Sequence, residues 1–149
     1  VSAQSRVAVG VRKVEMEEVF EQSDIISIHA PELPSTYHIV NEASIASMKD
    51  GVILINTARG TAIDEQALAK ALLSGKIKTA CLDVYDPEPP CADNPLLKLD
   101  NCIMTPHIAG QAANGLQRIG YNCYCQLLHF LAGERMQGEI TRDMLNHIA

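Results

Sequence analysis

The chain has 149 residues, about the length of one domain with a substantial hydrophobic core, and 47% of its residues are apolar. Its formal net charge is −6 and no basic run compensates for it, which argues against nucleic acid or an anionic membrane as a partner. Two Phe, four Tyr and no Trp leave few rings to stack on bases, which again disfavours nucleic acid.

Predicted helices and strands alternate from the start of the chain. Short runs rich in Ile and Val, bounded by turn residues, predict strands, and apolar residues at three- and four-residue spacing predict helices. Pro31 ends the first buried strand, because proline cannot donate to a ladder. The first elements are a short helix in residues 1–10, an edge strand in 11–14, an amphipathic helix in 16–22, a buried strand in 25–29 and a helix in 41–48.

Residues 52–60 are the most informative stretch. Four consecutive aliphatic residues predict a strand that is buried on both faces, as in a parallel sheet. Arg59 stands just beyond the carboxyl end of this strand, Gly60 lets the backbone turn, and Asp64 can cap the next helix. The later elements are a helix in 64–74 that ends at Gly75, a strand in 79–84, a proline-rich loop in 86–90, a strand in 101–105 and a long helix in 110–132.

This alternation, with connections long enough for crossovers, predicts an α/β fold with a parallel sheet covered by helices. In such a sheet, the residues just beyond the carboxyl ends of the strands lie along one rim. The rim collects an arginine, two acids and two histidines, whereas the strand interiors hold hardly any charge, so we expect a catalytic site there. The rim residues are His29 to Pro31, Thr57 to Arg59, Asp83 to Glu88, and Pro106 with His107.

Each rim residue also has a purely structural interpretation. Arg59 can be a surface arginine, and His29 can simply finish a strand with a satisfied hydrogen bond. Asp83 can cap a turn through its own backbone, and Glu88 can be an exposed loop acid. His107 lies between a proline and small residues, so a structural role as a core histidine suits it less well than a functional role. Taken together, the structural interpretations of the rim residues require several coincidences at one edge of the sheet.

The rim residues suit the reduction of a 2-keto acid. Arg59 has a planar fork that can hold the carboxylate of the substrate, and His107 can donate a proton to the carbonyl oxygen. Glu88 would orient His107 and raise its pKa, because a nearby carboxylate favours the imidazolium. A nicotinamide would supply the hydride, because no side chain can do so.

The five cysteines form no regular framework. Cys81 lies in a predicted strand, while Cys123 and Cys125 lie on different faces of a predicted helix. Because a Cys-x-Cys pair on a helix lacks ligand geometry, we expect free thiols and no metal site. No signal peptide or membrane span is visible, so we expect a cytoplasmic protein.

Several segments occur in an order and spacing that resemble a known family over nearly the whole chain. They are Ile28-His29-Ala30-Pro31, Ile55-Asn56-Thr57-Ala58-Arg59-Gly60, Leu82-Asp83-Val84-Tyr85 with Glu88-Pro89, and Thr105-Pro106-His107-Ile108-Ala109-Gly110. The chain resembles the D-isomer-specific 2-hydroxyacid dehydrogenases, a family that includes D-3-phosphoglycerate dehydrogenase, D-lactate dehydrogenase and hydroxypyruvate and glyoxylate reductases. The resemblance implies part of a doubly wound, Rossmann-like parallel sheet and a small-molecule 2-hydroxy or 2-keto acid substrate.

The resemblance also implies how the chain is divided and which residues act. Residues 1–110 would be the second half of an NAD(P)-binding domain, and 111–149 a long helix and a tail that returns toward the catalytic domain. Arg59, Glu88 and His107 would be the catalytic triad. The implied cofactor contacts are His29, Ala30, Pro31, Thr57, Ala58, Arg59, Asp83 (at the nicotinamide amide), His107 and Gly110.

The chain departs from the family in one large respect. None of its nine glycines forms the G-x-G-x-x-G turn, and the ribose-binding acid and the N-terminal catalytic segment are also missing. We therefore expect the C-terminal half of an NAD-dependent D-2-hydroxyacid dehydrogenase, homodimeric as the parent enzyme and inactive alone. The residues that distinguish NAD from NADP would lie upstream, so NADP remains open. The alternatives are a non-catalytic dinucleotide sensor of the corepressor type and an inactive fragment; the triad favours the enzyme.

Overall fold

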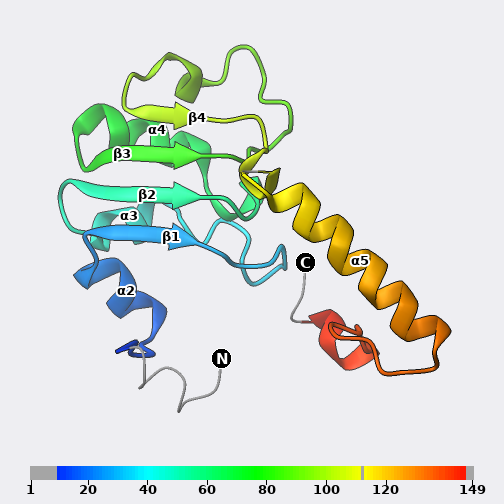
Figure 1. Ribbon diagram of the computed structural model, residues 1–149. Coiled ribbons are helices and arrows are strands. Elements are labelled where there is room, and N and C mark those ends of the chain that lie inside the picture. The colour runs from blue at the N-terminus through cyan, green and yellow to red at the C-terminus, as the bar shows by residue number, and fades with distance from the viewer. Residues whose placement is uncertain (1–9, 112, 147–149) are drawn as a thin grey trace.

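The chain builds a four-stranded parallel sheet in the order β1-β2-β3-β4 (Figure 1). The structure is a computed structural model that describes residues 10–111 and 113–146. The predicted α/β fold with a parallel sheet is confirmed. The strands are β1 (Ile25–Ile28), β2 (Val52–Asn56), β3 (Ile77–Leu82) and β4 (Cys102–Met104).

The register of the sheet aligns the carboxyl ends of the strands. Ile28 pairs with Asn56, Asn56 with Leu82, and Leu82 with Met104. The segments that follow these residues therefore leave the sheet at the same edge.

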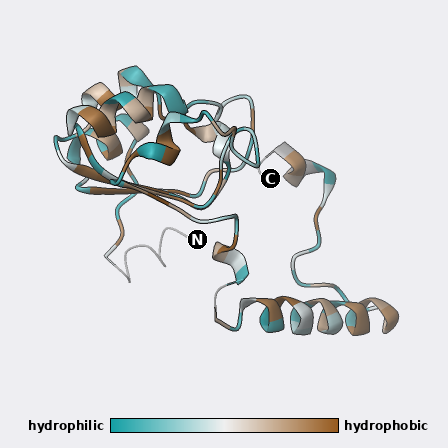
Figure 2. Ribbon diagram, turned by 90° about the horizontal axis from the view of Figure 1, so that it is seen from above, coloured by the Kyte–Doolittle hydropathy of each residue, from teal (hydrophilic) through white to brown (hydrophobic). Residues whose placement is uncertain are grey.

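Three α-helices lie on one side of the sheet (Figure 2). They are α2 (Met16–Gln22), α3 (Glu42–Ser47) and α4 (Glu65–Ser74). Polar side chains fix their starts: the Asp64 carboxylate accepts the N–H groups of Gln66 and Ala67 at the start of α4. Gly75 ends α4 with a φ of 78°, which glycine adopts without strain.

The hydrophobic core lies between the sheet and these helices. Its most deeply buried apolar side chains are Leu54, Leu68, Ile77, Leu96, Val40, Val52 and Val84. The opposite face of the sheet is more open, since Ile25 and Ile103 are 59% and 56% exposed and the alternate residues of β2 are only half-buried. The prediction that β2 is buried on both faces is therefore correct for one face only, because all three helices cover the same side.

The long helix α5 (Gly115–Leu131) extends away from the sheet, and none of its residues is buried (Figure 1). The predicted helix in 110–132 starts later than expected, because η3 (Ala109–Gln111) is a separate 3-10 turn. The other 3-10 turns are η1 (Gly60–Ala62), η2 (Pro95–Lys98) and η4 (Arg142–Asn146). Among the described residues, no helix is long and apolar enough to cross a membrane.

The predicted edge strand in residues 11–14 is wrong. These residues are irregular and pair with no strand of the described sheet, and Val11 is 55% exposed. Arg12 instead forms an ion pair with Glu18 of α2, so this segment packs on a helix and not on a strand. The predicted helix in 1–10 lies outside the described residues, apart from Gly10, which is in a turn.

Candidate active site

Arg59 follows β2 through a turn that a buried asparagine shapes. Asn56 has no exposed surface; its Nδ2 donates to the Arg59 carbonyl at 2.8 Å, and its Oδ1 accepts the Ala58 N–H at 3.0 Å. The next residue is Gly60, where an added Cβ would lie 2.0 Å from the carbonyl carbon of Tyr85. The Arg59 turn thus touches the segment that follows β3.

The Arg59 side chain is 43% exposed. Its Nη1 donates to the Ala58 carbonyl at 2.7 Å, and its Nε lies 4.0 Å from a Glu32 oxygen. A guanidinium has five N–H donors, so this arrangement leaves donors for the carboxylate of a ligand. Glu32 would compete with such a ligand only weakly, because both side chains are solvated.

His29, which follows β1, is engaged with its own strand. Its Nε2 lies 2.9 Å from the Ser27 hydroxyl oxygen. This is the hydrogen bond expected if His29 simply finishes the strand. Pro31 is held in turn, since its carbonyl accepts from the Thr36 hydroxyl at 2.6 Å. The predicted contacts of residues 29–31 with the cofactor remain predictions.

Asp83, just beyond β3, is the most deeply buried charged residue of the predicted set, at 3% exposure. One carboxylate oxygen accepts from the Thr105 hydroxyl and, at 2.9 Å, from the Ile108 N–H. The other accepts the Ala109 N–H at 2.8 Å. The Asp83 backbone carbonyl also accepts the His107 N–H at 2.9 Å, so one residue fixes the whole segment that follows β4.

These contacts decide the charge of Asp83. Burial alone would raise its pKa, but the hydrogen bonds from Thr105, Ala109 and Ile108 outweigh burial, and the pKa is lowered from its ordinary value of 3.8. The carboxylate is therefore ionised near neutral pH. Both of its oxygens are engaged within the chain, so the predicted contact with a nicotinamide amide remains a prediction.

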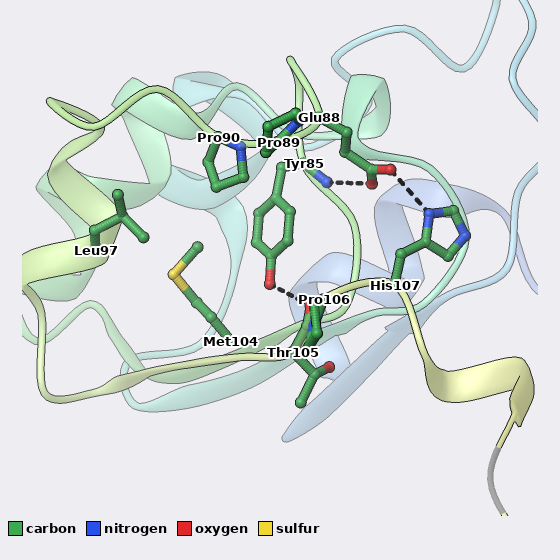
Figure 3. A pocket seen from close by; sticks show the side chains of 9 residues that line it. All are labelled: Tyr85, Glu88, Pro89, Pro90, Leu97, Met104, Thr105, Pro106 and His107. Carbon is green, nitrogen blue, oxygen red and sulfur yellow. Dashed lines mark hydrogen bonds and ion pairs between the residues drawn. The ribbon is translucent and has the colours of Figure 1, made fainter.

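Glu88 and His107 form the closest pair of predicted catalytic residues (Figure 3). Glu88 Oε2 lies 2.9 Å from His107 Nδ1, and Glu88 Oε1 accepts the Tyr85 N–H at 3.0 Å. The hydrogen bond with His107 lowers the pKa of Glu88, burial opposes this effect, and the Tyr85 N–H lowers the pKa further. Glu88 is therefore an anion that engages the Nδ1 atom of the His107 ring and not its Nε2 atom.

The backbone of His107 is in an uncommon conformation. Its φ is 52°, in the left-handed region that a residue with a Cβ rarely adopts. The His107 N–H donates to the carbonyls of Asp83 and Thr105, and these bonds hold it there. Conformations of this kind cluster at functional sites, which supports a functional role for His107.

Two hollows lie at this edge of the sheet. The larger, about 400 Å³, lies beside the Glu88–His107 pair and is lined mostly by apolar side chains, among them Tyr85, Pro89, Pro90, Leu97 and Met104 (Figure 3). The Tyr85 hydroxyl lies 2.6 Å from the Thr105 carbonyl and 2.9 Å from the Leu82 carbonyl, so Tyr85 ties the ends of β3 and β4 together.

The smaller hollow, about 120 Å³, opens at the carboxyl ends of β2 and β3. Thr57, Asp83 and Thr105 give it polar walls, and apolar side chains such as Ile55 and Ile103 form the rest. A flat ring with one polar substituent suits this lining, so the residues present fit the nicotinamide end of NAD. No group of three or more metal-ligating side chains occurs in the part of the chain that the structure describes.

Sequence reasoning assigned no individual role to four residues that shape this edge, although Tyr85 lies within the predicted rim. Asn56, Tyr85 and Thr105 bridge backbone segments, and Glu65 binds the proline-rich loop through Asp86 and Asn94. Of these four residues, only Asn56 had a recognisable signal in the sequence, because an asparagine stands at the end of an aliphatic strand. The others depend on pairings between distant residues.

The comparisons with known proteins agree with this geometry. Residues 2–109 match the family described as D-isomer specific 2-hydroxyacid dehydrogenase, NAD binding domain. A hydroxypyruvate reductase from Thermotoga maritima is 49% identical over 112 residues, which cover 74% of this chain and 37% of the relative.

Solved structures share the fold. A D-mandelate dehydrogenase from Rhodotorula graminis aligns with a TM-score of 0.81 at 32% identity, over 95% of this chain and 42% of its own. A D-lactate dehydrogenase from Aquifex aeolicus, solved with NAD and lactic acid, aligns with a TM-score of 0.74 at 35% identity, over 90% of this chain and 45% of its own. The chain thus spans about two fifths of the length of these relatives. The predicted Rossmann-like fold and NAD as the cofactor are confirmed.

Proposed function

This chain belongs to the D-isomer-specific 2-hydroxyacid dehydrogenase family, and on that basis we propose that the intact protein interconverts a D-2-hydroxy acid and its 2-keto acid. The hydrogen bond of 2.9 Å between Glu88 and His107 is the observation that carries the proposal. NAD, when bound, supplies the hydride chemistry. The residues of this chain bind the substrate and move the proton.

His107 is the acid and base of the proposed reaction. In reduction, its Nε2 donates a proton to the carbonyl oxygen while Nδ1 keeps its hydrogen bond to Glu88. In oxidation, neutral His107 accepts the hydroxyl proton at Nε2. The Glu88 carboxylate, which is held by the Tyr85 N–H, fixes the orientation of the ring.

Arg59 anchors the substrate in this proposal. Its guanidinium sits beyond β2 on the turn that Asn56 shapes, and its N–H groups can hold the carboxylate of the substrate by two hydrogen bonds. Holding the carboxylate orients the adjacent carbonyl toward His107 and the nicotinamide.

The wider assignments rest on the family. Residues 1–110 form the second half of an NAD-binding domain, and residues 111–149 return toward a catalytic domain. The intact protein is a homodimer in the cytoplasm and acts on a small 2-keto acid. A sensor of dinucleotides without catalysis, or an inactive fragment, is the competing function; the charged Glu88 beside His107 favours the enzyme, since a sensor needs no proton donor.

The experiment is an assay of the intact protein with NADH and a panel of small 2-keto acids, including hydroxypyruvate and glyoxylate. We expect turnover with at least one, formation of the D-isomer of the product, and a loss of about 100-fold or more in kcat for His107→Ala. A protein that binds NADH but reduces none of the panel, or a His107→Ala variant with undiminished turnover, would contradict the proposal.

A further inference from the structure

Glu65, the first residue of α4, reaches across to the loop that carries Glu88. The side chain is half-buried, and both of its carboxylate oxygens are engaged. Oε1 accepts the Asp86 N–H at 3.1 Å, and Oε2 accepts from Nδ2 of Asn94. One carboxylate thus binds a backbone donor and a side-chain donor that come from the same loop.

The two partners of Glu65 lie on either side of Glu88 in the loop between β3 and η2. Asp86 lies two residues before Glu88, and Asn94 is the last residue before η2; the segment from one partner to the other is called loop 86–94. The orientation of the Asn94 amide is fixed, because its Oδ1 accepts the Leu96 N–H at 2.9 Å and its NH₂ therefore needs an acceptor. Since Asn94 is only 8% exposed, an unpaired NH₂ there would be costly.

We propose that Glu65 is a positioning residue of the active site, which ties both ends of loop 86–94 to α4 and thereby holds Glu88 within hydrogen-bond reach of His107. Within the loop, Glu88 has only a local anchor, the Tyr85 N–H. The distant anchor is α4, which begins six residues after Arg59. Glu65 therefore couples α4 to the loop that carries Glu88, the residue that holds the His107 ring.

The neighbouring residue Asp64 offers a matched control. Its carboxylate caps α4 by accepting the N–H groups of Gln66 and Ala67, and it makes no hydrogen bond to loop 86–94. Removing either carboxylate weakens the start of α4. Only removal of the Glu65 carboxylate also releases the loop.

This inference rests on the proposed function, so its first test needs no activity. The pH titration of the Glu88 carboxyl is followed by NMR on protein labelled at glutamate. The charged groups that face Glu88 are His107 and, at longer range, Asp83. We expect Glu65→Ala to move the midpoint of the Glu88 titration to higher pH, because the released loop loses the hydrogen bond to His107 that lowers the pKa of Glu88, and Asp64→Ala to lower Tm without moving the midpoint.

The second test measures the reduction rate of the intact protein. Glu65→Ala should lower kcat by about tenfold in the wild-type background and by less than about twofold in the Glu88→Gln background, because residues that act through one another are not additive. The KM for NADH should stay the same in all variants. Glu65→Gln keeps an acceptor for the Asp86 N–H but presents an NH₂ to Asn94, so its kcat should lie between those of the wild type and Glu65→Ala. This variant replaces Glu65→Ala in both tests if Glu65→Ala does not fold.

An unchanged Glu88 midpoint in Glu65→Ala would overturn the positioning role, as would an equal loss of kcat in both backgrounds. The absence of any reductase activity would overturn the proposed function instead. In that case the NMR titration still decides whether Glu65 positions Glu88.

Discussion

Glu88 and His107 lie on different loops, 19 residues apart in sequence, and their hydrogen bond is exposed on one side. Each depends on residues behind it: Glu88 on the Tyr85 N–H, and His107 on the backbone carbonyls of Asp83 and Thr105. The arrangement therefore rests on main-chain groups that substitution of side chains leaves in place. A single substitution of Glu88 by Gln can then be interpreted mainly as a change of charge.

Glu88→Gln should slow reduction by the intact protein. The Glu88 anion is hydrogen-bonded to His107 Nδ1, and an uncharged amide would weaken this charge-assisted bond and hold the ring less firmly. We expect kcat to fall by about tenfold or more, measured by NADH absorbance. An unchanged kcat would mean that the pairing has no catalytic role.

Asp83→Asn should change how stability depends on pH. The pKa of Asp83 is lowered in the folded state, so its charge stabilises the protein above the ordinary value of 3.8, and this stabilisation is lost as pH falls through the folded value. The variant should be less stable at pH 7, because an amide NH₂ would face the N–H groups of Ile108 and Ala109. It should lose less further stability on acidification than the wild type does.

Urea unfolding at pH 7 and near pH 3 measures both quantities for Asp83→Asn and the wild type. Glu88 titrates in the same range and is present in both proteins, so the difference between them isolates Asp83. Equal pH dependence in the two proteins would show that the pKa of Asp83 is the same in the folded and unfolded states, which would contradict the lowered pKa.

At the level of elements, the turn after β2 and the segment after β3 approach so closely that only glycine fits between them. A Cβ at Gly60 would lie 2.0 Å from the Tyr85 carbonyl carbon and oxygen. Both are backbone atoms, so no side-chain rotation relieves the overlap. The two segments also carry Arg59 and Glu88, and a shift between them would separate the proposed substrate anchor from the carboxylate proposed to orient His107.

Gly60→Ala should therefore destabilise the fold by about 2 kcal/mol or more, as forced overpacking does. The control is Gly120→Ala in α5, where an added Cβ meets nothing within 4 Å. Alanine there should be neutral or stabilise by up to about 1 kcal/mol, since glycine is a poor helix residue. Urea unfolding compares the two, and equal effects would mean that the backbone at Gly60 moves aside without cost.

Elements with local signals were predictable from the sequence. The residues of β2 and the Asp64 and Gly75 caps of α4 locate that strand and helix within one or two residues. Residues 11–14 have the apolar content of a strand, but pairing with another strand is not a local property. The rim was predictable because the carboxyl ends of parallel strands lie at the same edge of the sheet. The hydrogen bonds from Glu65 to Asp86 and Asn94 were not predictable, because they join residues far apart in the sequence and no local pattern indicates such a contact.

At the scale of the whole molecule, two apolar surfaces lack a covering layer within the described residues. One is the face of the sheet with Ile25 and Ile103, and the other is α5, whose Leu116, Tyr121 and Phe130 are each at least 60% exposed. A doubly wound sheet has helices on both faces, and this chain spans about two fifths of its relatives. The part of the fold that this chain provides brings together the proposed proton donor, His107, and the hollow that suits a nicotinamide.

The 149 residues should bind NADH weakly by themselves. They contain a hollow that suits the nicotinamide, but their nine glycines form no G-x-G-x-x-G turn to hold the pyrophosphate on backbone N–H groups. We expect a Kd above about 100 μM, since a partial site contributes only part of the binding free energy. Reduced nicotinamide mononucleotide, which lacks the adenosine half, should bind within about threefold of NADH, because the adenosine half finds no dedicated contacts.

Titration of the chain with both compounds, followed by their fluorescence, measures the two constants, and the intact protein serves as the reference. There, NADH should bind far more tightly than the mononucleotide, because the pyrophosphate and the ribose are also held. Micromolar binding of NADH to the 149 residues, with a large preference over the mononucleotide, would mean that these residues hold the adenosine half through contacts other than the glycine-rich turn. Equal, weak binding of both compounds would instead assign to this chain the nicotinamide end of the site.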